Sequence, residues 1–191
     1  MFSLTPAIDR IRDAASASHV RACIFLLLLS LVAFLPGFST LQPLDRDEPR
    51  FAQASKQMLE TGDFVDIRFQ DEARHKKPVG IYWLQSAAVR AGEAVGVSEA
   101  RTRIWLYRIP SLVGATATVL LTYWALLAFL SPPLALLGGA LMAAAVLLGV
   151  EARIAKTDAL LAACAVATMG ALARTWLDWT RSLAFVPDRR N

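Results

Sequence analysis

The fold is decided by residues 109–150, which read IPSLVGATATVLLTYWALLAFLSPPLALLGGALMAAAVLLGV. This run of 42 residues contains no Asp, Glu, Lys, Arg or His. A helix that crosses a bilayer needs only about 20 apolar residues. Ser131, Pro132 and Pro133 interrupt the run near its middle, and such a cluster is typical of a turn. The stretch therefore predicts two membrane-spanning helices joined by a tight turn, rather than one core helix of a soluble protein.

Other apolar segments extend this pattern outward. Residues 22–38, ACIFLLLLSLVAFLPGF, predict a retained first span, since the sequence that follows is a poor match for a signal-peptide cleavage site. We expect an all-α integral membrane protein with about four transmembrane helices, at about residues 22–38, 104–131, 134–150 and 159–178. Arg174 lies inside the fourth of these segments, and we expect its side chain to reach toward the membrane surface.

Charge placement predicts the orientation. The 191 residues carry a net charge of +4, and both chain ends have more arginines than acids. Such an excess favours the cytoplasmic side, which leaves the long segment 39–103 facing the periplasm of a bacterial inner membrane. Basic and acidic residues alternate without forming a stripe, which argues against nucleic acid as a partner. Cys23 and Cys164 lie in apolar segments and indicate neither a disulfide framework nor a metal motif.

The outer loop, residues 39–103, is predicted to contain two helices that lie at the membrane interface. The first follows residues 47–49 (DEP) and ends at residues 61–62 (TG), since a glycine commonly follows the last residue of a helix. The second begins at Pro78 and carries a tyrosine and a tryptophan, which favour membrane–water interfaces. The intervening segment reads as a loop with a short extended piece.

Three carboxylates are candidate catalytic residues: Asp47, Glu48 and Asp158. With four spans, the outer loop and the connection 151–158 lie on the same side of the membrane. A carboxylate there could act as a general base toward an acceptor hydroxyl, or could hold a divalent cation. The alternative is that Asp47 and Asp158 only cap the helices that they precede.

Basic residues form a second candidate group, in the segment RHKK directly before Pro78. Arg74, Lys76 and Lys77 could hold a phosphate at the start of a helix, where free amide N–H groups also attract anions. Ordinary attraction to lipid headgroups is the alternative. Arg108, at the start of the second span, could stabilise a phosphate leaving group or simply anchor the helix. The same two alternatives apply to Arg103, Arg153 and Lys156.

Four motifs occur in a recognisable order: DRDEPRFAQASKQMLETGDFV (45–65), KKPVGIYWLQ (76–85), RIPSL (108–112) and ARIAKTDALL (152–161). In this order, separated by these spans, they resemble the membrane glycosyltransferases of the aminoarabinose-transferase and protein O-mannosyltransferase superfamily, the GT-C type. The resemblance covers about residues 20–175. It implies transfer of a sugar from a polyprenyl-phosphate carrier to lipid A, another envelope glycan or a protein hydroxyl, as in lipopolysaccharide modification.

The resemblance also implies roles for particular residues. Asp47 takes the position of the family's catalytic acid in the first outer loop, and Asp158 that of the second acid. Lys77 takes the position that contacts the carrier phosphate. Lys76 stands where aminoarabinose transferases typically have a glutamate, which argues against a metal site there and against aminoarabinose as the sugar.

The family has more than four spans, so we expect this chain to be the N-terminal module of a longer enzyme, inactive alone if later spans complete the site. The alternative is a non-catalytic four-helix membrane protein that binds lipid phosphate or a partner subunit. A small transporter is disfavoured, because a transporter would place ionisable residues within its spans and residues 109–150 have none.

Overall fold

The structure, a computed structural model, describes residues 16–43 and 46–184, with side chains to residue 180. These residues are predominantly helical, as predicted. The helices are α2 (His19–Phe34), α3 (Asp47–Thr61), α4 (Gly80–Ala94), α5 (Ile104–Leu126), α6 (Pro132–Ala143), α7 (Val146–Glu151) and α8 (Asp158–Ala184), with a short 3-10 turn, η1, at Ala100–Thr102. A two-stranded antiparallel hairpin, β1 (Arg68–Phe69) and β2 (Glu72–Ala73), is the short extended piece expected between α3 and α4.

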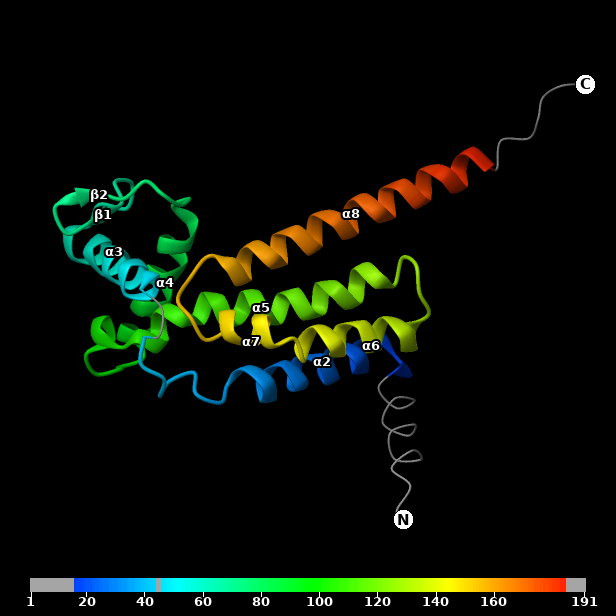
Figure 1. The fold of residues 1–191 in the computed structure, drawn as a ribbon, viewed down its shortest axis with the longest axis horizontal. Helices are drawn as coiled ribbons and strands as arrows, with labels where there is room; N and C mark the ends of the chain where they lie inside the picture. Colours follow the sequence, from blue (N-terminus) through cyan, green and yellow to red (C-terminus); the bar gives the residue numbers. More distant parts are fainter. Residues whose placement is uncertain (1–15, 44–45, 185–191) are drawn as a thin grey trace, which may run out of the picture.

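The long helices form a bundle in which the chain repeatedly reverses its direction (Figure 1). Helices α2, α5, α6 with α7, and α8 run alongside one another. Helices α3 and α4 and the hairpin lie together at one end, which we call the outer end, and residues 47–103 form the outer unit. The connection from α7 to α8 lies at the same end (Figure 1). The outer unit and residues 151–158 therefore lie at the same end of the bundle.

Two described helices are long and apolar enough to cross a membrane: α5 and the first 23 residues of α8, Asp158–Thr180. Helices α2 and α6 are apolar but shorter. Helix α2 ends at Phe34, four residues before the predicted end of the first span, and α5 ends at Leu126 rather than at residue 131. The predicted fourth span lies within α8.

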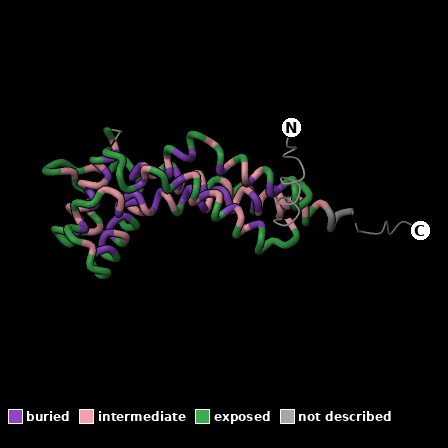
Figure 2. Tube along the Cα trace, turned by 90° about the horizontal axis from the view of Figure 1, so that it is seen from below, coloured by how far each residue is buried: buried purple, intermediate pink, exposed green. Residues whose placement is uncertain are grey.

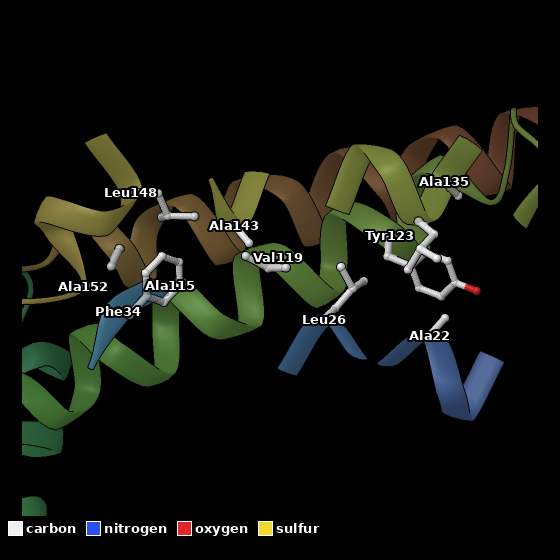
Figure 3. Packing of buried hydrophobic residues seen from close by; sticks show 12 residues of the cluster. Ala22, Leu26, Phe34, Ala115, Val119, Tyr123, Ala135, Ala143, Leu148 and Ala152 are labelled. Carbon is white, nitrogen blue, oxygen red and sulfur yellow. The ribbon is translucent and has the colours of Figure 1, made fainter. Parts of the chain in front are cut away.

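The prediction of one continuous helix over residues 134–150 is wrong. Helix α6 ends at Ala143, Ala145 has an extended backbone, and α7 begins at Val146. The break redirects the chain so that Leu148, on α7, joins the same buried cluster as Phe34 at the end of α2 (Figure 3). Tertiary packing therefore overrides the helical preference of this alanine-rich segment.

The bundle buries a narrow core and leaves much apolar surface exposed. The core contains Leu26 of α2, Val119 and Tyr123 of α5, alanines of α6, and Leu148 of α7 (Figure 3). Buried positions lie on the inner sides of the helices, whereas their outward sides are exposed (Figure 2). Val32 on α2 is 73% exposed and Val146 on α7 is 83% exposed. Apolar side chains on so many outward faces are typical of helices surrounded by lipid.

Gly114 of α5 packs directly against the backbone of the first turn of α8. A Cβ atom at this position would lie 2.8 Å from the Leu160 backbone nitrogen. We therefore expect Gly114→Val to separate the two helices and to lower stability by about 1–3 kcal/mol or more. Thermal unfolding in detergent micelles measures the effect. Gly80→Ala is the matched control, since a Cβ there meets no atom within 4 Å; equal melting temperatures for both variants would contradict the prediction.

Candidate functional site at the outer end

Helix α3 carries the first two candidate carboxylates in its opening turn. It begins at Asp47, and acids in a first turn are favoured by the helix dipole. Pro49 is the third helical residue rather than the first. Gly62, at a φ of 75°, ends the helix, as the sequence predicted. Arg46 is the N-cap residue and makes no side-chain capping bond, so Asp47 does not occupy the capping position.

Glu48 is fully buried and forms an ion pair with Arg108 near the start of α5. Arg108 Nε donates to Glu48 Oε1 at 2.7 Å, and the second terminal nitrogen donates to Oε2 at 3.2 Å. The other terminal nitrogen of Arg108 donates to the carbonyl oxygens of Phe38 and Leu41, at 2.8 and 2.9 Å. The exposed fractions of the two charged side chains are 0% and 1%. Both charged groups therefore interact with protein atoms rather than with solvent.

The same carboxylate reaches the connection that precedes α8. The backbone N–H of Ala155, a fully buried residue, donates to Glu48 Oε1 at 3.0 Å. A single side chain thus joins α3, the first turns of α5 and the connection between α7 and α8. The neighbouring Lys156 is held as well, because the Ser111 hydroxyl donates to its carbonyl oxygen at 3.0 Å.

This geometry gives Glu48 and Arg108 a different role from the predicted ones. Glu48 was a candidate catalytic residue and Arg108 a candidate phosphate ligand, but each is buried against the other in this conformation. One sequence signal pointed to the pair. An arginine at the start of an apolar helix is stable in a buried position only with an opposite charge, and the acidic cluster at residues 45–48 supplies several candidates.

Asp47 and Asp158 remain accessible at the outer end. The Asp47 side chain is 46% exposed, and its Oδ1 lies 3.3 Å from a terminal nitrogen of Arg50. Asp158 is the first residue of α8 and is exposed. Its place in the first turn fits the helix-terminal interpretation and leaves its carboxylate open to solvent.

The predicted phosphate ligands before α4 divide into two groups. Lys76 and Lys77 are exposed. Arg74 instead packs on the outer unit, with its guanidinium carbon 5.4 Å from the centre of the Phe51 ring. That ring stacks on Tyr82 of α4, so Arg74 covers the contact between α3 and α4.

His75 lies in the turn that follows β2. Its Nε2 lies 2.9 Å from Asp66 Oδ1, and Arg68 donates to the other carboxylate oxygen at 3.1 Å. These two hydrogen bonds, that with His75 first, lower the pKa of the Asp66 carboxyl group. Asp66 therefore contributes this stabilisation above the ordinary carboxyl pKa and loses it as the pH falls through its own lowered value.

Arg103 and Arg153 bind backbone carbonyl groups. Arg103 donates to Ser98 at 3.3 Å. Arg153 donates to Pro36 at 2.8 Å, to Gly149 at 2.6 Å and to Ala33. Because Ala33 and Pro36 stand at the end of α2, Arg153 acts as a cationic cap of that helix.

A cavity of about 290 Å³ adjoins the buried ion pair. Its walls are mainly apolar, and they come from the turn after α2, the start of α3 and the end of α7. The lining residues are Pro36, Gly37, Leu41, Glu48, Arg108, Val150, Arg153 and Ile154. A cavity of this chemistry suits an alkyl segment better than a charged group.

Within residues 16–43 and 46–184, no group of three or more His, Cys, Asp or Glu side chains is arranged to hold a metal ion. Cys23 and Cys164 are free thiols. No protein-family model matches the chain, and no match to it is found among curated proteins or solved structures. Membership of the glycosyltransferase superfamily therefore stays a prediction from the four motifs.

Proposed function

We propose that this chain is a module of a bacterial inner-membrane glycosyltransferase, which moves a sugar from a polyprenyl-phosphate carrier to a hydroxyl group of an envelope acceptor. The acceptor is lipid A, another glycan or a protein. The observation that carries the proposal is that α3 and α8 begin, with the accessible carboxylates Asp47 and Asp158, at the end of the bundle that also bears the exposed Lys76 and Lys77. This set provides both a base and a phosphate ligand.

In the proposed reaction, the Asp47 carboxylate takes the proton of the acceptor hydroxyl while the hydroxyl oxygen attacks the anomeric carbon of the donor sugar. The bond from that carbon to the phosphate oxygen breaks, and the carrier phosphate leaves with the bonding electrons. Lys77 and Lys76 stabilise the growing negative charge on the phosphate. One displacement of this kind inverts the configuration at the sugar carbon.

The proposal includes four membrane crossings, by α2, α5, the α6–α7 segment and α8, with the outer end in the periplasm. The exposed apolar side chains of the bundle support it. Helix α4 presents Trp83 and Leu84, 49% and 48% exposed, and is proposed to lie at the membrane interface with α3.

A second candidate function is phosphate-lipid binding without chemistry. The commitment of Arg108 to Glu48 favours it, because the exposed cations among the predicted phosphate ligands are then Lys76 and Lys77, which bind phosphate as simple point charges.

The two functions are separated by placing the chain, with any further spans that the enzyme requires, in lipid nanodiscs with a polyprenyl-phosphate sugar that carries a radiolabel in the sugar. The proposed enzyme transfers the label to lipid A or to an acceptor peptide, or releases it to water. Saturable donor binding without loss of label from the carrier indicates the second function. Absence of both binding and transfer contradicts the two proposals together.

Lys77→Ala is expected to weaken donor binding by about tenfold, in keeping with the loss of one charge-assisted hydrogen bond at an exposed position. Donor titration in nanodiscs gives the dissociation constant. Lys56→Ala is the matched control, because Lys56 lies on α3 and pairs with Glu60 of the same helix at 3.7 Å. Equal donor affinity in the wild type and the Lys77 variant would remove the phosphate contact from the proposal.

A further inference from the structure

The outer unit and the connection before α8 are fastened to each other by Glu48. Its carboxylate accepts hydrogen bonds from two nitrogens of Arg108 and from the Ala155 backbone. Glu48 follows Asp47 directly in the first turn of α3, and Ala155 precedes Asp158 by three residues. Each accessible carboxylate is therefore close in sequence to a residue of this buried contact.

We propose that Glu48 and Arg108 form a positioning clamp, which fixes the first turn of α3 against the start of α8 and thereby sets the separation of Asp47 and Asp158. Neither clamp residue reacts with substrate. The catalytic meaning of that separation rests on the proposed function, whereas the mechanical effect of the clamp does not.

The directions of the hydrogen bonds support a positioning role. The guanidinium of Arg108 holds the turn after α2 through the carbonyl oxygens of Phe38 and Leu41, while its opposite edge holds Glu48. The Ser111 hydroxyl, one turn further along α5, holds Lys156. Helix α5 is therefore the common support from which both flanking segments are set.

Energetics distinguish positioning from simple stabilisation. Replacing a buried ion pair by apolar residues of similar volume is often neutral or stabilising, because the two charges no longer need to be removed from water. Such a replacement at Glu48 and Arg108 keeps the packing but leaves the Ala155 N–H without its acceptor. The contact between α3 and the connection before α8 then weakens although the protein stays folded.

The test uses spin labels on cysteines placed at Glu60 of α3 and Leu161 of α8, both exposed, with Cys23 and Cys164 replaced by alanine. Pulsed electron–electron double resonance in nanodiscs measures the distance distribution between the labels. Glu48→Met with Arg108→Met is expected to widen and shift this distribution.

The matched control is Glu93→Met with Arg101→Met, which removes an ion pair of 2.6 Å lying wholly within the outer unit. This control should leave the distribution unchanged. A narrow, wild-type distribution in the clamp variant would overturn the proposal, as would equal widening in the control. Glu48→Gln, which keeps one acceptor oxygen, provides the same readout if the double methionine variant does not fold.

An activity measurement adds a second readout. Glu48→Gln is expected to lower kcat while the KM for the donor stays unchanged, since Lys77 and its surface are untouched. A raised donor KM with unchanged kcat would contradict positioning of the carboxylates. If the wild type transfers no sugar, the proposed function fails, and the distance measurement still decides the clamp.

Discussion

Arg108→Ala is expected to destabilise the protein by about 3–5 kcal/mol, the usual effect of removing one partner of a buried ion pair. Glu48 would keep its charge in a fully buried position, and the carbonyl groups of Phe38 and Leu41 would lose their donor. Reversible unfolding in mixed micelles, followed by circular dichroism, measures the loss. The variant should unfold at markedly lower denaturant than the wild type.

Arg101→Ala is the control for this prediction. Arg101 also pairs with a glutamate, Glu93, but both side chains are about 40% exposed. Exposed pairs contribute only about 0–1 kcal/mol, so this variant should stay close to the wild type. A stable Arg108 variant, or equal losses for both arginines, would show that the buried pair is not required for the fold.

Asp47→Asn is expected to reduce sugar transfer by about 10²–10⁴-fold, the range that a general base contributes. The amide has nearly the same shape but cannot accept the proton of the acceptor hydroxyl. Membrane insertion and unfolding should remain normal, since Asp47 is half-exposed at the helix start. The transfer rate at saturating donor, in a chain that includes any further spans the enzyme requires, is the quantity to measure.

Asp71→Asn serves as the control, since Asp71 is an exposed acid in the hairpin of the same outer unit. It should transfer sugar at the wild-type rate. If the Asp47 variant also retains transfer, the Asp47 carboxylate only stabilises the start of α3 by interacting with the helix dipole, and another residue must be the base.

Several elements were predictable because their signals are local. Helix α3 ends where Gly62 allows a left-handed backbone, and α8 covers the predicted fourth span. The break between α6 and α7 was not predictable in this way. Residues 143–145 are all alanine, the best helix former, so the local sequence predicts no break there. Leu148, beyond the break, lies in the same buried cluster as Phe34.

The candidate site was likewise predictable only in part. The number of apolar segments predicts that Asp47 and Asp158 share one end, and the structure has this arrangement. The pairing of Glu48 with Arg108 spans 60 residues and depends on how α3 turns back onto α5. The sequence predicted a catalytic role for Glu48 and a phosphate contact for Arg108, and it did not predict that the two side chains pair with each other.

The two arginines that hold the turn after α2 also determine when that turn can form during biosynthesis. Arg108 follows Phe38 by 70 residues, and Arg153 follows Pro36 by 117. In a nascent chain that has only formed α2, those carbonyl groups therefore lack their arginine donors. That turn reaches its final form only after the ribosome has translated most of the remaining helices.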